Sequence, residues 1–193
     1  MPRTSVTPGP DGLKALSHPV RLRMLGLLRT EGPATATTLA NRLGLNSGAT
    51  SYHLRQLEKH GFISEDEERG NARDRWWRAA HESTQTDLAP TASPEEHDTY
   101  DGYLQAVAIV SHERLQRALE ERRSLPERWQ EAGDLSDWNI RLTPGRAKEM
   151  VEAVHALVET YADRPDDSEG AEVFRINVNA FVTPGVVTRS YES

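Results

Sequence analysis

The sequence predicts a mainly helical protein with a smaller β component, of the α+β class. Three observations lead to this prediction. Two short amphipathic helices joined by a tight turn are expected between residues 35 and 61, and an apolar helical period runs over about residues 94–123. Two later segments alternate apolar and polar residues like strands. With 193 residues, the chain can hold one large domain or two small ones.

A helix-turn-helix is predicted between Thr35 and Gly61. The first helix would cover residues 36–43, with Thr35 placed to cap its free N–H groups. Gly44 supplies the left-handed backbone conformation that the corner requires. The second helix would end at Gly61. Two short helices separated by such a turn are typical of this motif.

The second helix of the pair is expected to present short polar side chains and one arginine. Asn46 or Ser47 would cap it, and Leu54 would point inward. Short hydrogen-bonding groups and an arginine near a helix N-terminus suit the floor of the DNA major groove. The residues predicted to contact DNA here are Thr35, Ser47, Ser51, Tyr52 and Arg55.

A β-hairpin is predicted directly after the two helices. The β-prone residues 62–64 and 75–78 flank a polar run centred on Gly70 and Asn71. The hairpin would form a wing whose arginines reach phosphates or the minor groove. An ordinary helical hairpin in a core is the alternative, but it explains neither the wing nor the polar outer face. The predicted DNA-contacting residues of the wing are Arg69, Arg73 and Arg75.

The segment before the helix-turn-helix reads LKALSHPVRLRMLGLL and is expected to form supporting helices, with Ser17 capping the helix that contains Pro19 in its first turn. Together with SYHLRQLEKHGFI and the wing, it resembles the ArsR-type winged helix-turn-helix transcriptional regulators of bacteria over about residues 11–80. The resemblance implies a homodimer that binds a partly palindromic double-stranded DNA operator. It also implies a repressor that a signal releases from the operator.

Charge is distributed unevenly along the chain, whose net charge is −7. Residues 1–80 contain 12 Lys and Arg against 8 Asp and Glu, whereas residues 81–193 contain 11 against 22. DNA attracts the first part and repels the second. The acidic part is therefore expected to face away from DNA, where it could dimerise or sense a signal.

Domain boundaries follow from composition. Residues 1–10 are predicted as a disordered tail, 11–80 as the DNA-binding domain, 81–94 as a polar linker and 95–193 as a dimerisation and effector domain. No apolar run approaches the roughly 20 residues of a membrane span. The N-terminus lacks the apolar core of a signal peptide. We therefore expect a cytoplasmic protein that does not contact membranes.

A long helix is predicted from Ser93 and Pro94 to about Arg123. Its apolar stripe is too broad for one neighbour, so one side would pack in its own subunit and the other against a symmetry mate. Leu104 and Val107 are expected to lie in this dimer interface. A single-sided core helix is the alternative.

A small α/β module is predicted beyond the long helix. It would contain a short helix over 126–132, a strand over 138–142, a helix from Thr143 to about Arg164 and a strand over 172–182. The two strands are expected to pair with each other, directly or across the dimer. A lone strand would leave its backbone polar groups unsatisfied.

A pocket for a small organic effector is one use for this module. The alternative is that the aromatic residues fill a core and only widen the dimer interface. An amphipathic or aromatic effector would suit the available indole, phenol and amide groups. The candidate effector-binding residues are Tyr100, Tyr103, Trp129, Trp138, Asn177 and Asn179.

Metal sensing and catalysis have less support in the sequence. The chain has no cysteine, so it has no thiolate metal site and no disulfide. His97, Asp101, His112 and Glu113 could form a zinc or nickel site in a metal-responsive repressor, but scattered histidines make such pairs common. No phosphate-binding glycine loop or nucleophile motif occurs, so no catalytic residue, metal or cofactor is expected. A winged helix used as a protein-interaction module is the remaining alternative, against which the basic wing argues.

Overall fold

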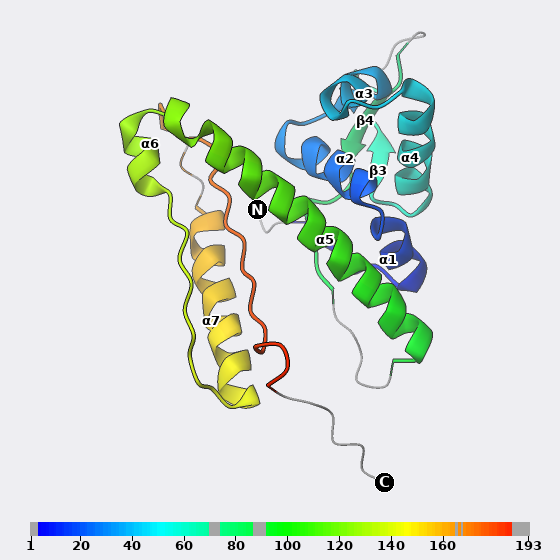
Figure 1. Ribbon diagram of the computed structural model, residues 1–193. Coiled ribbons are helices and arrows are strands. Elements are labelled where there is room, and N and C mark those ends of the chain that lie inside the picture. The colour runs from blue at the N-terminus through cyan, green and yellow to red at the C-terminus, as the bar shows by residue number, and fades with distance from the viewer. Residues whose placement is uncertain (1–3, 70–73, 87–91, 165, 167, 187–193) are drawn as a thin grey trace. The chain divides into compact units, whose positions relative to one another are not determined.

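The computed structural model describes residues 4–69, 74–86, 92–164, 166 and 168–186 (Figure 1). The chain divides into two compact units, Met1–Gly133 and Asp134–Ser193. The boundary lies well beyond the predicted linker 81–94, because the long helix packs with the N-terminal helices. None of the described helices combines the length and the apolar character that a membrane span needs.

Four helices build the N-terminal part of the first unit. Their bounds are α1 (Pro10–Leu16), α2 (Pro19–Thr30), α3 (Ala36–Leu43) and α4 (Ser47–Lys59). His18 caps α2, because its Nδ1 accepts the N–H of Val20 at 3.2 Å. Ser17 instead donates its hydroxyl to the carbonyl of Leu13 at 2.9 Å, so the prediction that Ser17 caps this helix is wrong.

The corner between α3 and α4 forms as the sequence predicts. The Thr35 hydroxyl accepts the N–H of Thr38 at 3.1 Å and so caps α3. Gly44 follows α3 with a φ of 64°, which only glycine adopts without strain. Asn46 then caps α4 by accepting the N–H of Ala49 at 2.8 Å. The helix-turn-helix prediction is confirmed.

The wing forms a three-stranded sheet with one strand more than predicted. β3 (Ile63–Glu65) and β4 (Trp76–Ala79) are antiparallel, with Ile63 opposite Ala79. β2 (Ala34–Thr35) pairs with the other edge of β4, which gives the order β2-β4-β3. A two-residue strand shows no alternation, so β2 left no signal in the sequence. The predicted tip of the wing, with Gly70, Asn71 and Arg73, lies outside the described residues.

Two segments predicted to lack regular structure also pair. β1 (Ser5–Val6), within the predicted tail 1–10, forms a parallel pair with β5 (Ser83–Thr84), within the predicted linker. Arg29 holds this pair to α2, because its Nε donates to the carbonyl of His81 at 2.8 Å and its Nη2 to the Thr84 hydroxyl at 2.9 Å. The long-range contact of Arg29 is not visible in local sequence patterns.

One continuous core joins the helices and the wing. Burying a large apolar side chain contributes roughly 1.5–3 kcal/mol, so this cluster is the main source of stability in the first unit. The buried side chains of the cluster are Leu13, Ala15, Leu16, Met24, Leu25, Leu28, Leu39, Leu54, Leu57, Phe62, Ile63, Trp77 and Tyr103.

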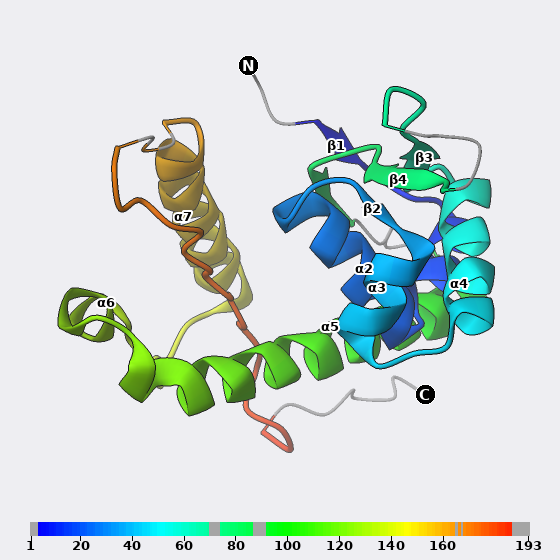
Figure 2. The same cartoon turned by 90° about the horizontal axis from the view of Figure 1, so that it is seen from above.

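The long helix α5 (Pro94–Glu121) starts at the predicted capping box. The Ser93 hydroxyl accepts the N–H of Glu96 at 3.3 Å, and the Glu96 carboxylate accepts the N–H of Ser93 at 2.7 Å. One side of α5 packs against α1 and α2 through buried side chains (Figure 2). A short 3-10 helix, η1 (Arg122–Ser124), and α6 (Glu127–Ala132) complete this unit.

The second unit contains one helix, α7 (Pro144–Ala162), among its described residues. Thr143 caps it by accepting the N–H of Arg146 at 3.4 Å. The segments 138–142 and 172–182 are extended beside α7 but form no strand among the described residues (Figure 1), so the direct pairing that the sequence allows is absent there. Pairing across a dimer stays a prediction. No described residue of this unit is buried.

Candidate nucleic-acid interface

The outer face of α4 presents the residues that the sequence assigns to base contacts. Tyr52 is 54% exposed, and Ser47 and Arg55 are also exposed, whereas Ser51 is half-buried. The opposite side of the same helix is fixed in the core. Its buried residues are Thr50, Leu54 and Leu57. The polar face is therefore mounted rigidly and turned to solvent.

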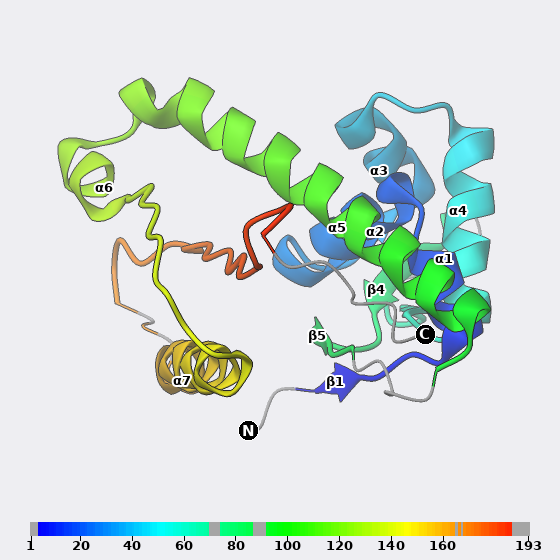
Figure 3. The same ribbon diagram turned by 60° about the horizontal axis from the view of Figure 1, so that its bottom comes forward.

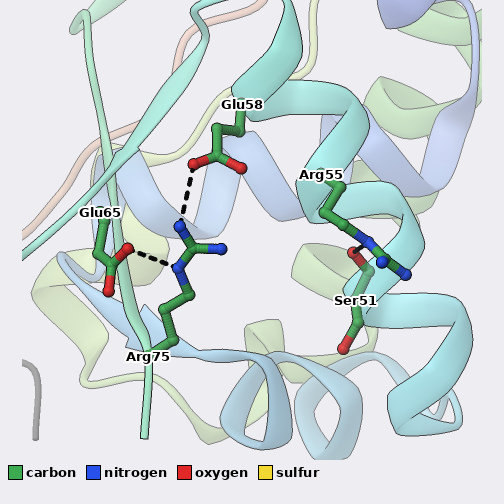
Figure 4. Close-up of polar contacts among 5 residues, drawn as sticks. All are labelled: Ser51, Arg55, Glu58, Glu65 and Arg75. Carbon is green, nitrogen blue, oxygen red and sulfur yellow. Dashed lines mark hydrogen bonds and ion pairs between the residues drawn. The ribbon is translucent and has the colours of Figure 1, made fainter.

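Arg55 lies back along α4 toward its N-terminal turns. Its Nε donates to the carbonyl of Ser51 at 3.3 Å (Figure 4). This bond uses one of the five N–H donors of a guanidinium, and paired donors on such a group match the acceptor edge of guanine. The structure thus places Arg55 and the half-buried Ser51 one turn apart on the same face of α4, as the sequence predicts.

Thr35 has a different setting from the other predicted DNA contacts. It is half-buried, and its hydroxyl is occupied by the N–H of Thr38 and by the Thr38 hydroxyl at 3.0 Å. Its observed role is to cap α3. A direct DNA contact by Thr35 remains a prediction.

Arg75 connects the wing to α4. Its Nε donates to the Glu65 carboxylate at 2.5 Å and its Nη2 to the Glu58 carboxylate at 3.3 Å (Figure 4). The guanidinium also lies 4.6 Å from the ring centroid of Trp77. The hydrogen bond to Glu65 is the largest cause of the raised pKa of Arg75. These partners make Arg75 a brace between wing and helix, a role that residue type alone did not reveal.

The other described arginines of the wing have few fixed partners in the structure. Arg69 is 60% exposed at its side chain and lies 3.6 Å from the Asp66 carboxylate. Arg78, which was not among the predicted contacts, is exposed on β4 and donates to the Ser64 hydroxyl at 3.3 Å. Both cations are placed where a phosphate could meet them. Arg73 lies outside the described residues.

His18, Arg21 and His53 form a polar cluster where the start of α2 meets α4. The rings of His18 and His53 are 4.6 Å apart, and Tyr52 meets His53 edge-on at 5.4 Å. Burial is the main cause that lowers the pKa of both histidines, and the charge of Arg21 adds to it. Among the described residues, the buried atoms Arg21 Nε and His53 Nδ1 have no hydrogen-bond partner.

An ion pair joins the helix-turn-helix to the long helix. Arg23 on α2 donates Nε–H to the Glu113 carboxylate at 2.8 Å, and its Nη2 bonds the second oxygen of the same group. Glu113 was a candidate metal ligand, and the structure gives it this cationic partner instead. Within the described part of the chain, no three His, Asp or Glu side chains gather into a group that could hold a metal ion.

The predicted effector residues are divided between the two units. Tyr103 is only 9% exposed and belongs to the core cluster, with Tyr100 packed against it. Trp129 lies on α6, whereas Trp138, Asn177 and Asn179 are exposed in the second unit. A depression in the first unit is lined by other residues, namely Leu27, Glu31, Arg42, Leu43, Arg117 and Glu121. An effector site remains a prediction.

The chain was compared with protein families and with known proteins, and the family match agrees with the helix-turn-helix described above. Residues 16–66 match a family model described as a helix-turn-helix domain. A crystal structure titled as a possible transcriptional regulator for arsenical resistance is 24% identical, with coverage of 55% of this chain and 94% of that chain, at a TM-score of 0.33. A mutant of Lactococcus lactis ZitR in apo form is 15% identical, with 73% of this chain and 80% of that chain covered, at a TM-score of 0.31. No curated protein is matched.

Proposed function

We propose that this chain, whose residues 16–66 match a helix-turn-helix domain, is an ArsR-like homodimeric transcriptional regulator that reads DNA with α4. The main support for the proposal is the way in which α4 packs on the core. Leu54 and Leu57 hold one side in the core, while Tyr52 and Arg55 stand exposed on the other. A rigid helix with exposed polar groups is the reading element of this class of domain.

Sequence would be read in the major groove and held by contacts to the backbone. Arg55 would donate to the acceptor edge of a guanine, and Tyr52 and Ser51 would contact neighbouring base edges. Arg69 and Arg78 on the wing would neutralise phosphates, and such contacts position a protein without reading sequence. Arg75 would act indirectly, by holding the wing at its place beside α4.

The second side of α5 is the proposed dimer interface. Leu104 and Leu119 are 43% and 44% exposed, and they share one face of the helix with Ala108 and Leu115. Val107 is half-buried and packs on the core cluster, so it belongs to the inner side of α5. The two residues predicted for the dimer interface, Leu104 and Val107, therefore lie on different faces of α5. Leu104 and Leu115 share the outer face and are the better pair for testing the interface.

A dimer of this kind would occupy two half-sites and act as a repressor in the cytoplasm. Half-sites one helical turn apart require recognition helices about 34–36 Å apart. The ion pair between Arg23 and Glu113 links the helix-turn-helix to α5. A change in the packing of the α5 helices in the dimer would therefore move the two α4 recognition helices. A small organic effector that prefers one dimer arrangement by about 1–3 kcal/mol would suffice to control binding.

Selection from a random pool of duplex DNA tests the reading function, because the protein itself picks out the operator. The full chain should enrich a partly palindromic motif, and the double variant Tyr52→Ala with Arg55→Ala should lose it. Gln105→Ala, an exposed change on α5 away from α4, is the matched control and should keep the motif. Enrichment of the same motif by the double variant would show that another surface reads the bases.

Light scattering tests the dimer interface separately. Leu104→Glu with Leu115→Glu should yield monomers, because two charges on each copy would meet an apolar seam. Gln105→Glu adds a charge to an exposed position outside that face and should leave the dimer intact. A stable dimer of the double variant would remove this face of α5 from the interface.

A further inference from the structure

The second unit exposes an apolar surface that a single chain does not cover. Of the nineteen large hydrophobic side chains that are exposed among the described residues, fourteen lie between Leu135 and Val186. Trp138 is 74% exposed and Val182 is 66% exposed. Monomeric proteins rarely show apolar patches of this extent, and such patches mark interaction surfaces.

Two extended segments in this unit have the same pattern. Residues 138–142 place apolar side chains at Trp138, Ile140 and Leu142, with polar residues between them. Residues 172–182 repeat this alternation, with apolar side chains at even positions from Phe174 to Val182 and polar residues at 175, 177 and 179. Each segment can therefore contribute to a sheet with one apolar and one polar face.

Both segments have the pattern of a strand but no strand partner in the part of the chain that the structure describes. Neither segment joins a sheet among the described residues, although both run along α7 in the same unit. Figure 3 views α7 nearly end-on, with both segments on the same side of it. An unpaired strand presents a row of free N–H and C=O groups, which is a template for pairing with another chain.

Helix α7 is apolar on two sides. Its half-buried residues follow one helical stripe, made of Ala147, Val151, Val154, Val158 and Ala162. A second stripe of Met150, Ala153, Leu157 and Tyr161 is exposed. A helix with a single neighbour needs one apolar stripe, so the exposed stripe calls for a second neighbour.

We propose that a second copy of this chain completes the unit by exchanging strands. Residues 138–142 of each copy pair with residues 172–182 of the other, and the α7 helices cover the apolar face of the resulting sheet. This inference rests on the proposed dimer and adds a second, intertwined interface to the one on α5.

A second copy is the occupant that fits the unpaired groups. Each chain offers one segment of each kind, so a two-fold exchange gives every segment of both copies a strand partner along one edge. The faces also agree, because the even positions of both segments carry apolar side chains, which would share one face of the sheet.

The absence of cysteine from the chain allows a clean cross-linking test. One chain carries Asn139→Cys, and a second chain, enlarged by a tag, carries Asn177→Cys or Asn179→Cys. Both positions lie on the polar face, away from the proposed sheet core. Under mild oxidation, the mixed dimers should form a disulfide between chains of different size, because paired strands bring Cα atoms within about 7 Å.

Two controls give the result its meaning. Ser168→Cys lies in an exposed turn of the same unit, and with Asn139→Cys it should stay uncross-linked. A single chain with both Asn139→Cys and Asn177→Cys should give linked dimers. An internal disulfide in a monomeric double variant would overturn the proposal in favour of pairing within one chain. Disulfides only between identical positions would overturn the exchange as well.

The failure of this proposal can be distinguished from failure of the proposed function. A dimer that binds its selected DNA but gives no mixed disulfide would contradict strand exchange and leave the regulator intact. Mixed disulfides in a protein that enriches no DNA motif would support strand exchange and contradict DNA reading.

Discussion

The two units of this chain have similar apolar sequence patterns, but only the first unit buries its apolar side chains. In the first unit, α2, α4 and the wing bury their apolar sides in one core, and Leu54 and Leu57 are fully buried. In the second unit, α7 and its two extended neighbours also carry apolar stripes, yet no described residue is buried. An apolar period indicates that a segment has a partner, but it does not say whether the partner lies in the same chain.

This difference fits a division of the proposed functions, with DNA reading in the first unit and assembly in the second. A surface that reads DNA has to be preformed, and the self-contained core of the first unit holds α4 in place. A unit that is complete only with a second copy reports on assembly, because its structure depends on the partner. Substitutions in each unit test this division, and the largest effect is expected on α4.

The double variant Tyr52→Ala with Arg55→Ala should abolish specific binding to the selected operator. Each good base contact contributes about 1–3 kcal/mol, so loss of two should weaken binding by at least about thirtyfold. Fluorescence anisotropy measures the affinity, and an unchanged melting temperature shows that the fold is intact. An affinity within a factor of two of the parent would show that α4 is misassigned as the reader.

Truncating an apolar side chain to alanine should affect stability differently in the two units. Leu54→Ala should cost about 2–5 kcal/mol of unfolding free energy at any protein concentration, because Leu54 is fully buried within one chain. Leu157→Ala should lower stability only at concentrations where the protein is dimeric, because Leu157 is 59% exposed in the single chain. Calorimetry over a concentration series distinguishes them. Concentration-independent destabilisation by Leu157→Ala would place its partner in the same chain.

Arg75→Ala should have a moderate effect that differs from loss of a phosphate contact. The exposed ion pairs of Arg75 contribute at most about 1 kcal/mol to stability. Operator affinity should fall because the wing loses its brace, while the slope of log affinity against log salt stays the same. Lysine should not restore it, because an ammonium cannot replace the planar fork between Glu58 and Glu65.

A salt slope reduced by about one unit in Arg75→Ala would instead identify Arg75 as a phosphate ligand. Gel-shift titrations at several salt concentrations provide this slope. Arg78→Ala is the comparison variant, because Arg78 is exposed and its assigned role is a phosphate contact.

The smallest predicted effect is on the stability of the protein at acidic pH. The pKa values of His18 and His53 are lowered by burial and by neighbouring Arg21, so the folded state favours the neutral rings. The unfolded state takes up protons first, near the ordinary value of about 6.5. The contribution of the two neutral histidines to stability is therefore present above that pH and is lost as the pH falls below it.

The variant His18→Asn with His53→Gln should have a flatter pH dependence between about pH 7.5 and 5.5 than the parent. Asparagine retains the ability to cap α2, so the helix start is preserved. Melting temperatures across this range provide the comparison. Equal pH slopes in parent and variant would show that the two histidines do not control acid stability.

Local signals account for most of what could be predicted from the sequence. Thr35, Gly44 and Asn46 each act within a few residues of their position, and the bounds of α3 follow from them. The capping box at Ser93 locates the start of α5 for the same reason. The wing is also local, because β3 and β4 are neighbours in the sequence.

What could not be predicted depends on residues distant in sequence. The bracing of Arg75 by Glu58, the pairing of Arg23 with Glu113 and the anchoring of His81 by Arg29 are side-chain contacts that no period announces. Residue type alone places Arg75 among the DNA contacts and Glu113 among the metal ligands. The burial of Tyr103 likewise depends on α1 and α2 packing on α5.

Hydrogen exchange followed by mass spectrometry, over a series of protein concentrations, tests the contrast between the two units most directly. Amides of α2, α4, β3 and β4 should be protected at every concentration, because their partners lie in the same chain. Amides of residues 138–142 and 172–182 should be protected only where the protein is dimeric. Rapid exchange of these segments in the dimer, or equal protection of them in the monomer, would contradict the account.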